Sequence, residues 1–387
     1  MTYYLLDSDG RFVFRMLRKL HLLRIASRNF SPTSPSTSTT ALTFIDFSLS
    51  DEILKTAQAQ IDRHSHQFIV DLYDDLQKTG EIRQKIYSIR GDLRKCFPSS
   101  EVRLVPIGSA ANLLLNRQSD LDLVFLPATG ENEWKQFMKK FEHNIAFRSD
   151  YMKKTRDSIR SKNIGFCLPP FLHAKIPLVR LESKRGLQVD IQFGNIGPIR
   201  SSLFVRTCVE FDERVALLIH WLTRQFRDFG ILSSPKGKFS RYHVNVLVIH
   251  FLQAIPYPIL PDIMRIAPFL STQNDWNNAV KVLTKQGSLY VPGCSSEKPN
   301  EQNVGGLAVQ LVDYFSQIDF VKNAIDTRGN VFNRASPDAY SFELVDEYFE
   351  HSTCRVQDAP RLLTNFFADL KAKLQNGQFE ELFHYDI

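Results

Sequence analysis

The chain is poor in cysteine and lacks a long apolar run. Its 387 residues include five cysteines, Cys96, Cys167, Cys208, Cys294 and Cys354. Their scattered spacing predicts neither a disulfide framework nor a zinc site, and a reducing compartment fits better. The richest apolar stretch, residues 244–260, is interrupted by a histidine, a glutamine and two prolines. We therefore expect no membrane span and no membrane partner.

Acidic residues are missing from residues 11–45, where six Lys and Arg residues interleave with apolar side chains at roughly helical spacing. A Ser/Thr/Pro tract occupies residues 31–40. An arginine-rich, serine-rich and acid-poor start is typical of a mitochondrial transit peptide, so residues 1–43 predict import into the mitochondrial matrix. Asp7 and Asp9, ahead of the basic run, disagree with this interpretation. A cytoplasmic protein with a basic tail is the alternative.

Charge of neither sign dominates the composition. Lys and Arg number 48 against 42 Asp and Glu, which gives a formal net charge of +6 and a pI near 8.9. This modest excess permits a polyanionic partner such as RNA without establishing one. The length predicts two or three domains, and 43% hydrophobic residues are enough for each to bury a core.

A Gly-Ser turn followed by an acidic strand stands within residues 107–125. Gly108 lets the backbone approach a ligand closely, and Ser109 adds a hydroxyl donor, which together suit a phosphate. Asp120 and Asp122 are two residues apart in an apolar run, so a strand would point both carboxylates to one face. Such a pair is stable beside a divalent cation. An isolated Asp-x-Asp is more often a solvated strand end. The metal-site interpretation therefore depends on the Asp-x-Asp pair occurring together with the Gly-Ser turn and the apolar strand.

A third carboxylate is available from a second strand. Residues 186–193 alternate between apolar and polar side chains with Asp190 at their centre, and another apolar run precedes them at residues 174–181. A third carboxylate beside Asp120 and Asp122 would complete a site for Mg²⁺ or Mn²⁺ next to the phosphate-binding turn. This combination is what phosphoryl transfer requires.

Helical periodicity predicts most of the other elements. Residues 51–96 have the apolar spacing of two helices separated near Gly80, with Ser50 in the N-terminal cap. Residues 131–151 are expected to form one helix that crosses between strands of one sheet. From Asp212 onward the chain is expected to be mostly helical.

Together these motifs resemble the template-independent RNA nucleotidyltransferases of the DNA polymerase β-like superfamily, the atypical poly(A) polymerases and terminal uridylyltransferases. The Gly-Ser turn and the three aspartates stand in the family's order and spacing. The resemblance continues through residues 251–261 and a poly(A)-polymerase-associated region at residues 303–355. Residues 176–180, the serines at 201–202 and the apolar helix at 247–253 are similar to the mitochondrial poly(A) polymerases in particular.

The resemblance implies an α+β fold. A polymerase β-like nucleotidyltransferase α/β domain would occupy residues 44–210, and a mostly helical poly(A)-polymerase-associated domain would occupy residues 211–387. Helices within residues 45–100 belong to the first domain or pack on the second.

The resemblance also implies a reaction, the addition of nucleotides to RNA 3′ ends by two-metal nucleotidyl transfer, with AMP from ATP preferred. A terminal uridylyltransferase that uses UTP, a mixed-nucleotide tailing enzyme and a catalytically weak RNA-binding relative are the alternatives. Expected partners are an RNA 3′ end and a nucleoside triphosphate, and a homodimer or an accessory RNA-binding protein is left open.

The family's functional residues carry over position by position. Asp120 and Asp122 would bind both metal ions, and Asp190 would bind one and help to deprotonate the RNA 3′-hydroxyl. The residues expected to contact the nucleotide are Gly108, Ser109, Asn195, Ser201, Ser202, Ser240 and Tyr242. The Gly-Ser pair would hold the triphosphate, and the tyrosine would stack on the base.

Two positions depart from the family or match it loosely. The helix before Trp221 lacks the family's triphosphate-binding lysine, because Ile219 stands in its place. His220 or Arg224 would have to compensate. The family's late histidine, which helps to choose uracil over adenine, maps loosely near His351.

Overall fold

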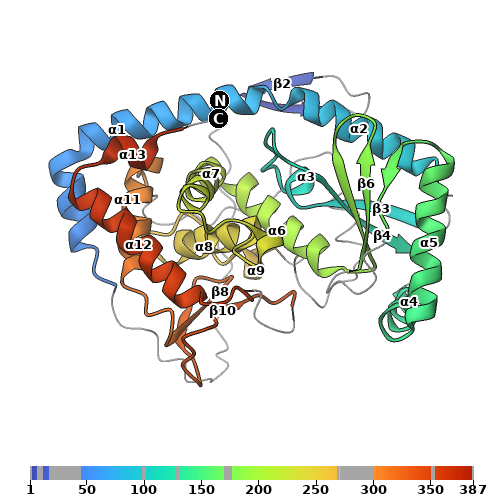
Figure 1. Ribbon diagram of the computed structural model, residues 1–387. Helices are drawn as coiled ribbons and strands as arrows, with labels where there is room; N and C mark the ends of the chain where they lie inside the picture. Colours follow the sequence, from blue (N-terminus) through green and yellow to red (C-terminus); the bar gives the residue numbers. More distant parts are fainter. Residues whose placement is uncertain are drawn as a thin grey trace, which may run out of the picture.

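A computed structural model of the chain contains one five-stranded sheet with helices on both faces and a second, mostly helical part (Figure 1). This architecture confirms the predicted α+β fold class. The structure describes residues 2–6, 12–16, 45–97, 102–127, 131–169, 177–267, 270, 300–349 and 354–385. Within these ranges, every helix is too short or too polar to cross a lipid bilayer.

The five-stranded sheet carries the acidic motifs. Its strands are β3 (Val102–Ile107), β4 (Leu121–Pro127), β5 (Gly165–Cys167), β6 (Leu178–Ser183) and β7 (Gln188–Phe193). Their order is β3-β4-β7-β6-β5. β4 and β7 run parallel, and the other neighbouring pairs are antiparallel. The parallel pair needs a long crossover connection, and the helices between β4 and β7 provide it.

Strand alternation divides the sheet between two cores. The helices of this part are α2 (Gly80–Arg94), α3 (Ser109–Asn112), α4 (Glu131–His143), α5 (Ile145–Ser161) and α6 (Gly197–Phe211). Odd-numbered strand residues such as Leu123 and Ile191 pack in one core with α2, α4 and α5. Even-numbered Val124 and Leu126 pack in a larger core with α6 and the helical part. The even-numbered face therefore looks toward the helical part.

The second part is mostly helical. Its helices are α1 (Ser48–Gln77), α7 (Glu213–Asp228), α8 (Arg241–Ala254), α9 (Ile263–Ile266), α11 (Val304–Ser316), α12 (Ala359–Gln375) and α13 (Phe379–Phe383), with a 3-10 turn at Ser234–Lys236. A small sheet has the order β10 (Glu343–Val345), β8 (Asn323–Asp326), β9 (Val331–Asn333). The buried Trp221 donates from Nε1 to the carbonyl of Leu382 at 2.8 Å, which holds α13 on α7.

Helix α1 lies along one side of the molecule, from the helical part toward α2 (Figure 1). It packs on α11, where a Cβ added at Gly305 would lie 2.5 Å from Ser65 Oγ, so a larger residue would not fit. The backbone N–H of the buried Ser50 donates to Asp313 Oδ2 in α11 at 2.9 Å. Helix α1 therefore shares the core of the helical part, whereas α2 shares a core with the sheet.

The structure corrects two helix predictions. The single helix predicted over residues 131–151 is two helices, because Asn144 leaves helical geometry and its side chain accepts a backbone hydrogen bond at 2.9 Å that caps α5. The first helix begins at Ser48, and Asp46 accepts from its backbone N–H at 2.9 Å. Ser50 is thus inside the helix and not its cap.

The N-terminal residues differ from the expected import-type helix. β1 (Thr2–Leu6) and β2 (Phe12–Met16) form an antiparallel pair, so helical geometry is wrong for residues 12–16. Four of these five residues are apolar, and so short an apolar run fits a strand as well as a helix. The rest of the predicted transit segment lies outside the described residues.

Candidate active site

Three acidic side chains and one arginine form a row across the sheet. Asp122 on β4 lies directly opposite Asp190 on β7, and Asp190 lies opposite Arg180 on β6. Opposing residues of paired strands point to the same face, and Asp120, two residues before Asp122, shares that face. The structure thus brings the three predicted carboxylates together. It also places beside them an arginine whose role the sequence reasoning missed.

Burial and neighbouring carboxylates disfavour the ionisation of Asp120 and Asp122. Burial, and then the charges of Asp190 and Asp120, raise the pKa of Asp122 from 3.8 to about 6. The pKa of Asp120 is raised by burial first and by Asp190 second. Arg180 and Arg241 act in the opposite direction on both groups without cancelling the effect. A bound divalent cation would relieve this repulsion, and carboxylate oxygens are ligands that Mg²⁺ and Mn²⁺ prefer.

Arg180 already holds one of the three carboxylates. Its Nε donates to Asp190 Oδ1 and its Nη2 donates to Oδ2, both at 2.7 Å, so both carboxylate oxygens are engaged. Among the described residues, no three carboxylate, imidazole or thiolate groups already stand within reach of one common metal ion. Because Arg180 engages both oxygens of Asp190, we expect Asp190 to turn toward Asp122 when the two carboxylates share an ion. The donor set fits a hard divalent ion under that condition.

The predicted phosphate-binding turn packs directly against the carboxylates. Gly108 has φ +59°, a conformation that favours glycine, and a Cβ added there would lie 3.1 Å from Asp122 Oδ2 and press on that carboxylate. Its N–H donates to Ser202 Oγ at 2.8 Å, and that hydroxyl donates to the carbonyl of Pro198 at 2.6 Å. Ser202, predicted to contact the nucleotide, is buried and fixes the turn on α6. The half-buried Ser109 hydroxyl has no hydrogen-bond partner among the described residues.

The residues predicted to face the base and ribose have their polar groups engaged within the protein. The hydroxyl of Tyr242 donates to Asp346, and burial raises the pKa of Tyr242 far above its usual value. Ser201 Oγ donates to the carbonyl of Pro198 at 3.3 Å. Asn195 Oδ1 accepts from a backbone N–H at 3.2 Å.

Ser240 caps α8, accepting from the backbone N–H of His243 at 3.3 Å. Its hydroxyl therefore positions the helix that carries Tyr242. The nucleotide contacts of Asn195, Ser201, Ser202, Ser240 and Tyr242 stay predictions, and these hydrogen bonds show what orients each side chain. His351 lies outside the described residues.

A group of cations lies beside the carboxylates, on the side of α7 and α8. A cavity of about 340 Å³ is lined by Asp75, Asn116, Arg117, Gln118, His220, Thr223, Arg224, Arg227 and Tyr385. Ile219 is only 2% exposed and cannot replace the missing lysine, and Arg224 is paired with Asp228 at 2.6 Å. Arg241, by contrast, has no ion-pair partner in the described part of the chain, although Asp120 and Asp122 attract its charge. The sequence reasoning missed Arg241 because its approach to Asp120 and Asp122 joins distant parts of the chain, which no local spacing indicates.

The chain matches known proteins over most of its length. Residues 61–210 match the family model of the mitochondrial-like poly(A) RNA polymerase central palm domain. Poly(A) RNA polymerase GLD2-B of Xenopus laevis is 26% identical over 291 residues, which cover 72% of this chain and 52% of that protein. Human poly(A) RNA polymerase GLD2 is 25% identical over 288 residues, which again cover 72% of this chain and 52% of that protein. The chain thus spans about half the length of these curated relatives.

Solved structures share the fold. The GLD-2/RNP-8 complex superposes with a TM-score of 0.60 at 20% identity, covering 84% of this chain and 99% of that chain. The structure of mtPAP in complex with UTP superposes with a TM-score of 0.60 at 20% identity, covering 92% of this chain and 76% of that chain. The Cid1 poly(U) polymerase bound to MgGTP superposes with a TM-score of 0.60 at 16% identity, covering 83% of this chain and 98% of that chain. The palm-domain match and the curated relatives show that the chain is similar to the poly(A) RNA polymerases, including the mitochondrial ones, and the solved structures show that it shares their fold.

Proposed function

We propose that the chain adds nucleotides to RNA 3′ ends without a template, with AMP from ATP as the preferred unit. The observation that carries this proposal is the convergence of Asp120, Asp122 and Asp190 on one face of the sheet, against the turn at Gly108. The named relatives are poly(A) RNA polymerases, which supports the choice of AMP.

The roles of the residues follow from their positions. Asp120 and Asp122 would hold two Mg²⁺ or Mn²⁺ ions, and Asp190 would share one. When bound, these ions supply Lewis-acid activation of the 3′-hydroxyl and of the pyrophosphate leaving group in an in-line displacement. Asp190, released by Arg180, would help to take the proton of the attacking hydroxyl. Gly108 and Ser109 would hold the phosphate against the carboxylates.

Arg241 takes the role of the triphosphate cation in this proposal. Its burial lowers its pKa, yet an arginine stays protonated, and no described carboxylate pairs with it. A guanidinium that is withdrawn from water and lacks a partner gains from a phosphate ligand. Arg227 extends the same positive region, and its charge lowers the pKa of Arg241. His220 adds no charge there near neutral pH, because burial lowers its pKa to about 4.

Uridylyl transfer is the second candidate. The similar structures include mtPAP with UTP and a poly(U) polymerase, and the residues expected to contact the base are the ones whose roles remain predictions. A catalytically weak RNA-binding relative is the third, motivated by Ile219 in place of a lysine.

Separate incubations of the purified chain with labelled RNA and each nucleoside triphosphate decide among these functions. Preferential extension by ATP supports poly(A) addition, whereas preferential extension by UTP favours uridylyl transfer. RNA binding without metal-dependent extension by any triphosphate would contradict both. Asp120→Ala and Asp122→Ala are expected to abolish extension while the circular dichroism spectrum is unchanged.

We also propose a mitochondrial matrix location and a catalytic unit at residues 44–210 followed by a helical unit at residues 211–387. The basic and acid-poor start of the chain supports the location, with the cytoplasm as the alternative. Import into isolated mitochondria tests it through loss of about the first 30 to 40 residues. A homodimer or an accessory RNA-binding protein stays open as a partner, and GLD-2 itself occurs in a complex with RNP-8.

A further inference from the structure

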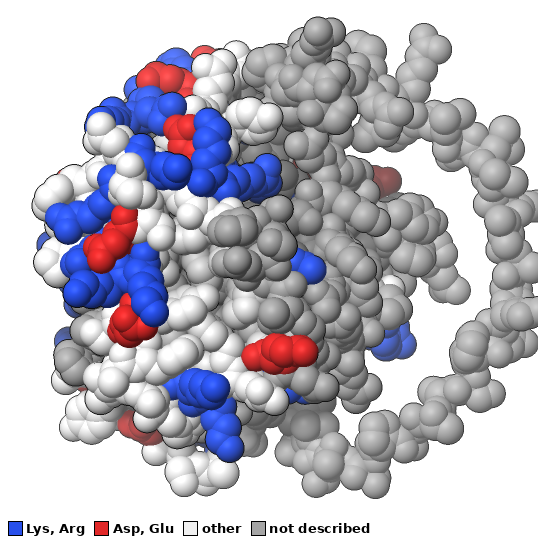
Figure 2. Space-filling model, turned by 90° about the vertical axis from the view of Figure 1, so that its right-hand side faces the viewer, with Lys and Arg blue, Asp and Glu red and all other residues white. Residues whose placement is uncertain are grey.

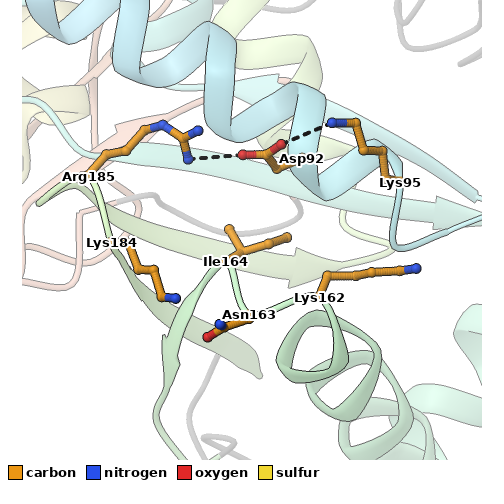
Figure 3. Close-up of a pocket in the computed structure, with 7 residues that line it drawn as sticks. All are labelled: Asp92, Lys95, Lys162, Asn163, Ile164, Lys184 and Arg185. Carbon is orange, nitrogen blue, oxygen red and sulfur yellow. Dashed lines mark hydrogen bonds and ion pairs between the residues drawn. The ribbon is translucent and has the colours of Figure 1, made fainter.

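A second, basic cavity lies on the sheet part and shares no residue with the carboxylate row. Its volume is about 450 Å³, and Figure 3 shows its lining residues, Asp92, Lys95, Lys162, Asn163, Ile164, Lys184 and Arg185. These come from the end of α2, the turn after α5 and the hairpin between β6 and β7. The backbone N–H of Lys184 donates to the carbonyl of Ile164 at 3.1 Å. Main-chain pairing therefore holds the hairpin and the turn together.

The charges of this cavity are not balanced. Asp92 is its one acidic lining residue, and it is shared between Lys95 at 3.3 Å and Arg185 at 2.9 Å (dashed lines in Figure 3). Within the described ranges, neither Lys162 nor Lys184 has an ion-pair partner. Two ammonium groups are thus left to bind an anion from outside the protein.

Neutral groups complete a phosphate-like environment. Asn163 has φ +54°, a left-handed conformation that asparagine tolerates better than most residues, and its side-chain amide makes no hydrogen bond to any described group. The neighbouring Ile164 is 6% exposed and adds an apolar surface. Ammonium and amide donors around one cavity fit the oxygens of a phosphate ester.

The cavity belongs to a wider basic face. Residues 90–95, 150–162 and 182–186 contain ten Lys and Arg residues against four Asp and Glu residues. Figure 2 looks onto this end of the molecule and shows Lys and Arg outnumbering Asp and Glu on its described surface. A face of this kind attracts polyanions, and RNA is the polyanion that the proposed reaction already requires.

We propose that this cavity binds a backbone phosphate of the RNA strand whose 3′ end lies at the carboxylates. The inference rests on the proposed function for the identity of the strand. Lys184 follows Arg180 by four residues along β6 and its turn, a path of about 13 Å at roughly 3.3 Å per residue. Arg180 lies opposite Asp190, whereas α2 and α5, whose ends line the cavity, pack on the other face of the sheet. An RNA that leaves the carboxylates would therefore reach the cavity by passing the hairpin at the end of β6, a path of a few nucleotides.

The test compares two double variants in the full chain. Lys162→Gln/Lys184→Gln removes the unpaired cations of the cavity. Lys139→Gln/Lys140→Gln removes the same charge from exposed positions on α4, outside the cavity, and is the matched control. Fluorescence anisotropy without ATP gives the dissociation constants for a long single-stranded RNA and for a dinucleotide over a range of salt concentrations.

The cavity variant is expected to bind the long RNA about tenfold more weakly at about 0.1 M salt, and its salt slope is expected to fall by about 0.7 for each phosphate that the variant no longer binds. The ratio of long-RNA to dinucleotide affinity should fall in this variant alone. Equal losses of affinity in both double variants, or no loss in the cavity variant, would overturn the proposal. If inorganic phosphate displaced the long RNA at concentrations similar to that of the RNA, the cavity would instead be a site for free phosphate.

Failure of this inference can be told apart from failure of the proposed function. RNA binding that depends on Lys162 and Lys184, in a chain that extends no RNA, would refute the polymerase assignment alone. RNA extension by a chain whose two double variants bind long RNA equally well would refute the cavity assignment alone. Thermal unfolding of both variants checks that each is folded.

Discussion

Replacing Asp122 by asparagine is expected to stabilise the metal-free protein while removing its proposed activity. The folded-state pKa of Asp122 is about 6 against an ordinary value of 3.8. At about 1.4 kcal/mol per pKa unit, the ionised carboxylate lowers the free energy of unfolding by about 3 kcal/mol at pH 8. An asparagine at this position would carry no charge and keep the shape of the side chain, so Asp122→Asn should recover this amount.

The stabilisation by Asp122→Asn is expected to depend on pH. A carboxyl whose pKa is raised on folding is protonated in the native state before it is protonated in the unfolded state. The cost of Asp122 is therefore fully present above pH 6 and fades as the pH falls from 6 toward 3.8. The stability difference between Asp122→Asn and the wild type should shrink from about 3 kcal/mol at pH 8 to about 1.5 kcal/mol at pH 5.

Urea unfolding with a chelator present, at pH 8 and pH 5, measures these differences. Asp74→Asn is the control, because Asp74 is exposed and has no ion-pair partner among the described residues, and a change within about 0.5 kcal/mol is expected there. Added Mn²⁺ should stabilise the wild type more than Asp122→Asn. Destabilisation by Asp122→Asn at pH 8, or a gain that does not depend on pH, would refute the electrostatic account of this site.

Three further substitutions test neighbouring parts of the site. Arg241→Ala should raise the KM for ATP by about tenfold or more, because a charge-assisted hydrogen bond contributes about 1.5–3 kcal/mol. Steady-state kinetics with an unchanged KM would exclude Arg241 from phosphate binding. Gly108→Ala should abolish extension, because the added Cβ meets Asp122 Oδ2 at 3.1 Å, and extension at the wild-type rate would contradict the packing described. Leu113→Gly should raise the free energy of unfolding by about 1 kcal/mol, because glycine relieves the strain of φ +69° and little packing is lost at a half-exposed side chain. A lower midpoint of thermal unfolding in this variant would argue against strain at Leu113.

The carboxylate row was predictable from the sequence because its signals are local. Asp120 and Asp122 show the two-residue period of a strand, and Asp190 stands in a second alternating run, so a shared face requires only that the two strands are neighbours. The pairing of β4 with β7 meets that requirement. The α+β class follows in the same way from strand-like runs in the first half of the chain and helical periodicity in the second.

Features that depend on long-range contacts were not predictable. The packing of α1 on α11 joins residues far apart in the chain, and no spacing within either helix indicates its partner. The hydrogen bonds that hold Gly108 on Ser202 and Asp190 on Arg180 arise from side chains meeting across elements. The break at Asn144 was missed because a capping asparagine inside an amphipathic run looks like a polar position of one helix.

We propose that three converging carboxylates make this chain a metal-dependent RNA nucleotidyltransferase. The most direct measurement is the extension of a labelled RNA by the purified full chain with ATP, with and without Mg²⁺ or Mn²⁺, alongside Asp120→Ala. The account predicts a ladder of added nucleotides that requires the divalent ion and is lost in the variant. An extension that persists in Asp120→Ala, or no extension by the wild type with any nucleoside triphosphate and either ion, would contradict it.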